Sequence, residues 1–294
     1  MIPSTHALCF DGVMQPFRQV DVFSVEPWLG NPLAVVHDAD DWSEHQMAAF
    51  ARWTNLSETT FLCAPTDPGA DYGVRIWTTG GELPFAGHPT LGSAHAWLEA
   101  GGEPRRADVV VQECGAGLVE VRREGERLAF AAPRLTRSGP VGLDDRERVL
   151  AALDVPPERV IDLAWVDNGP GWIGVELDSA QTVLDVVADP LRFAGLQVAV
   201  IGRYAADVAS ATGVDVEVRA FYADDSGFVE DPVTGSANAG LAQWLMEAGR
   251  LPERYVAAQG SQLQRAGRIH LERIDGQVWV GGASVTRIVG SVHP

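Results

Sequence analysis

Two segments of the sequence place an ionisable residue before a proline and then a run of small residues. Residues 88–94 read His-Pro-Thr-Leu-Gly-Ser-Ala, and residues 231–237 read Asp-Pro-Val-Thr-Gly-Ser-Ala. Aligned without gaps, with His88 opposite Asp231, the two segments share Pro, Gly, Ser and Ala. Each continues into an apolar stretch that ends near Glu-Ala-Gly. We interpret them as one module that is repeated in the two halves of the chain.

Each module has the pattern of a helix start that could bind an anion. Proline suits the first helical position because its missing N–H would have no partner there, which puts His88 and Asp231 at or beside a helix cap. Small residues in the first turn, such as Gly235 and Ser236, leave space for a ligand beside free N–H groups. If the two helix starts face each other, we expect a small anionic ligand between them. The alternative is two ordinary helix starts without a ligand.

A carboxylate at the beginning of an apolar run is a second candidate for chemistry. Glu58 stands directly before the β-branched and apolar residues 59–62. Burial there would raise the pKa of its carboxyl group and favour a role in moving protons. The alternative is an exposed glutamate at the edge of a strand.

Short β-type runs and a few helices must position these residues. Ser43 and Gln46 form a capping-box pattern that predicts a helix over 47–53, and further helices are expected near His88 and over 144–153. Asp275-Gly276 predicts a hairpin between the runs 268–274 and 277–281. The other expected strands are 18–23, 32–36, 59–62, 74–77, 109–111, 117–121, 160–166, 172–177 and 214–221.

The chain is long enough for two domains, each with a core of its own, at 294 residues. Residues 133–140 are rich in Pro, Ser and Gly and interrupt the strand pattern. We therefore expect an N-terminal half over residues 1–132 and a C-terminal half over residues 133–294.

The composition excludes several partners and chemistries. A formal charge of -18 and a pI near 4.7 disfavour binding to nucleic acids. The sequence contains no Lys, which excludes Schiff-base chemistry and covalent attachment of pyridoxal phosphate. The histidines are dispersed, so no metal is expected, and no cofactor motif is present.

The cysteines and the apolar segments predict a cytoplasmic protein. Cys9, Cys63 and Cys114 form no Cys-x-x-Cys pair and are expected to be reduced thiols. The N-terminus does not resemble a secretory signal. No apolar stretch approaches the roughly 18 residues that cross a bilayer, so we expect no membrane partner.

Four ordered motifs resemble those of the PhzF family of phenazine biosynthesis-like proteins. They are Val22–Val36, Asn55–Phe61, Glu82–Gly92 and Glu230–Ala237. The resemblance implies the α+β fold of diaminopimelate epimerase. In that fold two pseudo-symmetric halves each wrap a mostly antiparallel sheet or barrel around a central helix. The active site lies between the halves, and the C-terminal strand can cross back to the first.

The resemblance also implies an activity. Its members include cofactor-independent isomerases that move a proton on a small carboxylate-bearing substrate such as trans-2,3-dihydro-3-hydroxyanthranilate. By the match of motifs, Glu58 is the expected acid/base catalyst. The family further suggests a homodimer. The expected substrate-binding residues are Gly87, His88, Asp231, Gly235 and Ser236.

Two alternatives stay open at this point. One is an amino-acid-type epimerase or racemase in which Glu58 and a second group, Asp231 or His88, act on opposite faces of one carbon. Two-thiol racemisation is not expected, because no cysteine falls in either helix-start motif. The other is a protein that binds a small anion without turnover. Residues 75–82, where family members often have Phe-Thr-Pro, depart from the family pattern and leave the substrate open.

Overall fold

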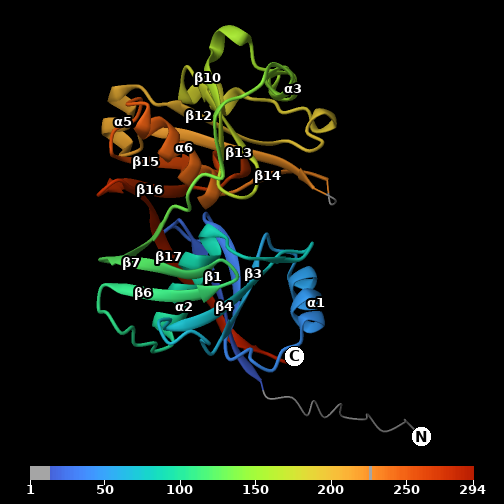
Figure 1. The fold of residues 1–294 in the computed structure, drawn as a ribbon, viewed down its shortest axis with the longest axis vertical. Helices are drawn as coiled ribbons and strands as arrows, with labels where there is room; N and C mark the ends of the chain where they lie inside the picture. The colour runs from blue at the N-terminus through green and yellow to red at the C-terminus, as the bar shows by residue number, and fades with distance from the viewer. Residues whose placement is uncertain (1–13, 225–226) are drawn as a thin grey trace, which may run out of the picture.

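The protein consists of two β-rich lobes, each built around one helix (Figure 1). The computed structural model describes residues 14–224 and 227–294. Over these residues the strands form one hydrogen-bonded network of 17 members. In Figure 1 the N-terminal lobe runs from blue to green and the C-terminal lobe from yellow to orange. The last strand, β17 (Gln277–Val292), runs from the second lobe into the first.

The N-terminal lobe is a closed barrel of eight strands. Its ring order is β1, β2, β3, β4, β6, β7, β8 and β17, which pairs again with β1. The pairs β2–β3 and β4–β6 are parallel, and the others are antiparallel. Besides β17, the strands of the ring are β1 (Gln15–Val22), β2 (Asn31–Val36), β3 (Thr59–Cys63), β4 (Tyr72–Trp77), β6 (Val109–Cys114), β7 (Gly117–Glu124) and β8 (Arg127–Ala131). The short strand β5 (Glu82–Leu83) pairs with β4 and is not part of the ring.

Helix α2 (Gly87–Glu99) lies inside this barrel. It contacts β1, β2, β3, β6, β7, β8 and β17, and nine of its 13 residues are buried. Small residues allow the tight fit: a Cβ added at Gly92 would lie only 2.5 Å from Leu33 Cδ2. Helix α1 (Glu44–Thr54) packs outside the barrel against Phe61 and Trp77, and it begins with the predicted capping box of Ser43 and Gln46.

The C-terminal lobe repeats the pairing pattern around α6 (Gly235–Glu247). The pairs β11–β12 and β13–β15 are parallel, as β2–β3 and β4–β6 are in the first lobe. This lobe stays open, because no pairing joins β9 to β17 in the part of the chain that is described. Its strands are β9 (Arg137–Pro140), β10 (Val160–Asp167), β11 (Trp172–Leu177), β12 (Gln197–Arg203), β13 (Val216–Asp224), β14 (Gly227–Asp231), β15 (Arg254–Gln259) and β16 (Gly267–Ile274).

Shorter helices cover the outside of the C-terminal lobe. A second apolar core forms between them and the sheet and includes Val149, Leu153, Phe193 and Phe221. The helices are α3 (Leu143–Leu153), α4 (Ala180–Asp185), α5 (Ala206–Thr212) and three 3-10 turns at Pro157–Arg159, Pro190–Arg192 and Ser261–Leu263.

Two crossing segments connect the lobes. β17 pairs with β16 at its start and then with β8 and β1. β8 in turn leads directly into β9, which pairs with β10 of the other lobe. A division into residues 1–132 and 133–294 remains our proposal, and it falls between β8 and β9. The predicted hairpin before β17 is confirmed, because Ile274 pairs with Gln277 and both Asp275 and Gly276 have positive φ.

The predicted register of the internal repeat is wrong. Both central helices have 13 residues, but α2 begins at Gly87 and α6 at Gly235, so His88 corresponds to Ser236 and not to Asp231. His88 is the second residue of α2. Asp231 ends β14, and Thr234 is the cap of α6. Pro89 misled the alignment because proline fits any of the first helical positions, where N–H groups have no partner within the helix.

Candidate active site

The two central helices meet at their first residues. A Cβ added at Gly87 would lie 3.2 Å from Gly235 Cα and 2.7 Å from Phe130 Cζ, and one added at Gly235 would lie 3.2 Å from Gly87 Cα. Only glycine therefore fits both positions without movement of the neighbours. The expected facing of two helix starts is confirmed. Their unpaired N–H groups and positive dipole ends make the contact region favourable for an anion.

Strand alternation directs Glu58 toward α2. Thr59 and Phe61 of β3 face α1: Thr59 Oγ1 lies 3.0 Å from Thr54 Oγ1, and Phe61 belongs to the cluster under that helix. Thr60 faces the opposite way and accepts a hydrogen bond from Ser93 of α2. Glu58 shares the orientation of Thr60, since alternate residues of a strand point to the same side.

Burial changes the acidity of Glu58. Its side chain is only 16% exposed, so the alternative of an exposed strand-edge glutamate is rejected. Loss of hydration, and then the negative charge of Asp231, raise the pKa of Glu58 to about 8. Glu58 Oε2 lies 3.5 Å from His88 Nε2, and neither atom has a hydrogen-bond partner among the described residues. Both atoms are buried and retain unused hydrogen-bonding capacity.

His88 is neutral, and its contact with Asn31 favours one tautomer of the ring. Burial lowers its pKa to about 3. Asn31 Nδ2 donates to Val233 O at 3.0 Å and approaches His88 Nδ1 at 3.5 Å. An amide nitrogen can only donate, so Nδ1 is the acceptor. The ring proton then lies on Nε2, which is the nitrogen that faces Glu58.

Asp231 contributes a second carboxylate from the other lobe. Its Oδ2 accepts a hydrogen bond of 2.5 Å from Thr234 Oγ1, and its Oδ1 lies 3.5 Å from Asn31 Nδ2. Burial raises the pKa of Asp231 to about 6, and these two donors oppose that rise. Asp231 is therefore mostly ionised at neutral pH while Glu58 is mostly protonated, as expected for two neighbouring carboxyl groups.

Ser236 is held by the wall of the second lobe. Its Oγ accepts a hydrogen bond of 3.0 Å from Trp172 Nε1, and its carbonyl accepts one of 2.9 Å from Asn168. Its hydroxyl proton is still available as a donor. Asn31 and Trp172 are the first residues of β2 and β11, and each contacts the second residue of the neighbouring central helix.

Sequence reasoning missed Asn31, although a signal was present. Asn31 is 1% exposed and begins a strand whose other residues are apolar. A buried amide needs hydrogen-bond partners, so a lone Asn at this point of an apolar strand suggests a polar site.

The other candidates for chemistry give no further site. Residues 14–224 and 227–294 contain no group of three or more His, Cys, Asp or Glu that could hold a metal ion. Cys63 and Cys114 are free thiols, and Cys9 lies outside the described residues. The same described ranges include no helix both long and apolar enough to cross a membrane.

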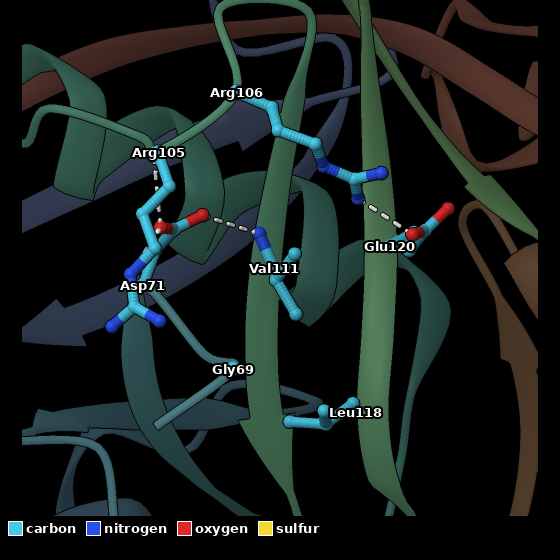
Figure 2. A pocket seen from close by; sticks show the side chains of 7 residues that line it. All are labelled: Gly69, Asp71, Arg105, Arg106, Val111, Leu118 and Glu120. Carbon is cyan, nitrogen blue, oxygen red and sulfur yellow. Dashed lines mark hydrogen bonds and ion pairs between the residues drawn. The ribbon is translucent and has the colours of Figure 1, made fainter. Parts of the chain in front are cut away.

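A surface hollow of about 330 Å³ beside β6 and β7 contains two arginines but does not suit an anion (Figure 2). Arg106 forms an ion pair with Glu120 at 2.6 Å, and Arg105 lies 3.8 Å from Asp71. Asp71 also accepts a hydrogen bond from the backbone N–H of Val111. Both cations are thus neutralised by neighbouring carboxylates.

Comparison with known proteins identifies the family. The family model described as "Phenazine biosynthesis-like protein" matches residues 20–290. The chain belongs to this family. The trans-2,3-dihydro-3-hydroxyanthranilate isomerase of Pseudomonas aeruginosa is 31% identical and aligns over 87% of this chain and 90% of its own length. "Antisense-enhancing sequence 1" of Schizosaccharomyces pombe is 33% identical over 93% of this chain and 97% of its own.

Solved structures agree with this assignment. A PhzF-family protein of Enterococcus faecalis superposes with a TM-score of 0.77 and 24% identity, over 96% of this chain and 100% of that one. A predicted epimerase of Pseudomonas aeruginosa gives a TM-score of 0.75 and 26% identity, over 95% and 99%. The predicted α+β epimerase-like fold is therefore confirmed. The protein is an enzyme of the isomerase and epimerase type found in this family.

Proposed function

We propose that the enzyme isomerises a small carboxylate-bearing substrate with Glu58 as its single proton-transferring group. One observation carries this proposal: Glu58 is largely buried, has a pKa raised to about 8, and directs an unpartnered oxygen toward His88. A carboxylate of that basicity can remove a proton from carbon, and the resulting acid is weak enough to hold it until it is returned.

The proposed reaction is a proton shift without net oxidation. Glu58 in its ionised form accepts a proton from one substrate carbon, and the electron pair of the broken C–H bond enters the conjugated system of the substrate. The double bond moves, and Glu58 returns the proton to another carbon on the same face. His88 Nε2–H, beside Glu58, is placed to donate a hydrogen bond to the substrate. Gly87, Gly235 and Ser236 are proposed to hold the substrate carboxylate through the facing helix starts.

We further propose trans-2,3-dihydro-3-hydroxyanthranilate as a substrate. It carries the required carboxylate next to a conjugated ring. Support comes from the relatives that bear its name, which are 31% identical in Pseudomonas aeruginosa and 33% identical in Pseudomonas chlororaphis.

NMR in D2O tests reaction and substrate together. We expect the wild-type enzyme to move the double bond of this compound with incorporation of solvent deuterium, and Glu58→Gln to do neither. Absence of turnover by the wild type would reject this substrate. Tight binding without any proton exchange, unchanged in Glu58→Gln, would instead indicate a protein that binds small anions without catalysis.

Asp231 supports an epimerase as the second candidate. It is a carboxylate from the opposite lobe with a pKa raised to about 6, so it could act on the other face of the same carbon. Deuterium incorporation with inversion at one carbon, and no movement of a double bond, would select this function.

We propose that the enzyme acts as a cytoplasmic homodimer. The support is the family resemblance, together with exposed apolar side chains on neighbouring segments, namely Val25, Trp28 and Val289. Arg287 and Arg265 hold the segment that contains Val25 and Trp28 through the backbone carbonyls of these two residues. Light scattering after size-exclusion chromatography distinguishes a dimer from a monomer of 31.5 kDa.

A further inference from the structure

A buried amide beneath Asp231 uses its full hydrogen-bonding capacity. Gln259, the last residue of β15, is 1% exposed. Its Nε2 donates to Asp231 O at 3.0 Å and to Thr234 Oγ1 at 2.9 Å. Its Oε1 accepts from Thr234 N at 3.0 Å and from Asn238 Nδ2 at 2.8 Å. With both donors and both acceptor positions occupied, the amide can adopt only one orientation.

This amide decides where the proton of the Thr234 hydroxyl points. The hydroxyl oxygen already accepts from Gln259 Nε2, so its one proton is left for Asp231 Oδ2 at 2.5 Å. Thr234 is the cap of α6, but its side chain makes no capping hydrogen bond to that helix. A threonine at a cap usually accepts from the first turn. Here the hydroxyl donates a hydrogen bond to the Asp231 carboxylate instead.

We propose that Thr234 and Gln259 are positioning residues that hold Asp231 as an ionised hydrogen-bond acceptor beside Glu58. The proposal deepens the proposed function, on which its catalytic consequence rests. The hydrogen-bond chain itself is a property of the folded protein and exists without substrate.

The groups around Asp231 determine whether loss of the Thr234 hydroxyl raises or lowers the pKa of Asp231. Glu58 and the neutral His88 come from the first lobe, and Glu230 precedes Asp231 on β14 but is paired with Arg219 at 2.8 Å. Burial raises the pKa of Asp231, whereas the hydrogen bonds from Thr234 and Asn31 lower it. Loss of the Thr234 hydroxyl should therefore raise the pKa of Asp231 and leave more of it protonated near neutral pH.

The first lobe contains a matched control. Gln112 Nε2 donates to Thr90 Oγ1 at 3.0 Å, as Gln259 does to Thr234, and both residues are buried. The Thr90 hydroxyl, however, donates to the carbonyl of Ala86 at 2.9 Å and not to a carboxylate. Thr90→Val thus removes the same kind of buried hydroxyl without affecting Asp231.

A substrate-free titration tests the proposal. The 13C resonance of the Asp231 carboxyl, assigned by its loss in Asp231→Asn, is followed against pH in wild type, Thr234→Val, Thr234→Ser and Thr90→Val. We expect a raised pKa in Thr234→Val alone, with the wild-type value restored by the hydroxyl of Thr234→Ser. An Asp231 titration that is the same in Thr234→Val and wild type would overturn the proposal.

Turnover assays separate this proposal from the proposed function. With the proposed substrate, Thr234→Val should shift the acid limb of kcat/KM toward lower pH, in the same direction as Asp231→Asn, because a protonated Asp231 no longer raises the pKa of Glu58, while Thr90→Val keeps the wild-type profile. A shifted titration without any turnover by wild type would support the positioning role and reject the proposed reaction. A uniform loss of turnover at every pH would contradict the positioning role.

Discussion

The two lobes share a scaffold but contribute different chemistry at equivalent positions. The second residue of α2 is His88, and that of α6 is Ser236. Leu83 ends the short strand before α2, whereas Asp231 ends the corresponding strand before α6. The helix caps are Ala86 and Thr234. A symmetric two-base enzyme would present a base at the same point of each lobe. We propose instead that the first lobe provides the single proton-transferring group, Glu58, and that the second provides a fixed anion, Asp231.

The difference extends to the strands. In the first lobe Glu58 precedes β3, while the corresponding strand β12 begins at Gln197 after Leu196. The first lobe is also a closed ring, and the second is open between β9 and β17 over the described ranges.

The largest expected effect follows from removal of the base of the first lobe. Glu58→Gln keeps the size of the side chain but cannot accept a proton, so kcat should fall by about 10² to 10⁴. Steady-state kinetics measure this, and near-UV circular dichroism checks the fold. Glu126→Gln, in an exposed turn of the same lobe, is the control. A loss of less than about tenfold would assign the proton transfer to another group.

A stability difference should distinguish the two central helices. Gly92 and Gly240 occupy equivalent positions, but an added Cβ meets Leu33 Cδ2 at 2.5 Å in one case and the backbone oxygen of Val166 at 2.2 Å in the other. A side chain can shift more easily than a backbone carbonyl. Gly240→Ala should therefore cost about 3 kcal/mol or more in the free energy of unfolding, and Gly92→Ala about 1 to 2 kcal/mol. Urea unfolding measures both, and equal or reversed costs would contradict the packing described.

The pH profile should report the electrostatic coupling between the lobes. Because Glu58 must be ionised to accept a proton, kcat/KM should fall about tenfold per pH unit below its pKa of about 8. Asp231→Asn removes the negative charge that helps to raise this pKa. The acid limb of the profile, where kcat/KM falls, should therefore move to lower pH. Glu120→Gln, an exposed carboxylate of β7, should leave the limb in place. An unmoved limb in Asp231→Asn would show that the two carboxyl groups are not coupled.

A smaller effect concerns stability in acid. Burial lowers the pKa of His37 to about 4, and Arg18 donates to its Nε2. The unfolded chain takes up this proton near pH 6.5 and the folded protein does not, so stability is lost as pH falls from about 6.5 toward 4. His37→Gln should weaken the pH dependence of unfolding in urea, with the exposed His45→Gln as control. If the free energy of unfolding depends on pH in the same way in wild type and His37→Gln, a contribution from this residue is excluded.

Local patterns predicted much of the fold. The capping box of Ser43 and Gln46, the Asp275-Gly276 hairpin and the strand expected over 59–62 depend on neighbouring residues and are confirmed. The expected helix over 144–153 is α3, and the expected strands 32–36 and 172–177 lie within β2 and β11. β12, which carries apolar residues on both faces, was not expected, because a continuous apolar run lacks the period of a half-buried strand.

Contacts between distant residues could not be predicted. Asn31 reaches Val233 from the other lobe, and Gln259 comes to Asp231 from a separate strand. Nothing in the neighbouring sequence of either amide indicates these partners. The repeat register failed although the sequence contained the correct signal: the Glu-Ala-Gly ends at Glu99 and Glu247 have the same separation as Gly87 and Gly235, whereas the Pro, Gly, Ser and Ala matches do not.

The most direct test of the account compares the two carboxylates in one assay. Glu58→Gln and Asp231→Asn are each incubated with trans-2,3-dihydro-3-hydroxyanthranilate in D2O, and deuterium at the substrate and product carbons is measured by NMR. We expect slow but detectable exchange in Asp231→Asn and none in Glu58→Gln. Exchange at the wild-type rate in Glu58→Gln, with exchange lost in Asp231→Asn, would contradict the assignment of the proton transfer to the first lobe.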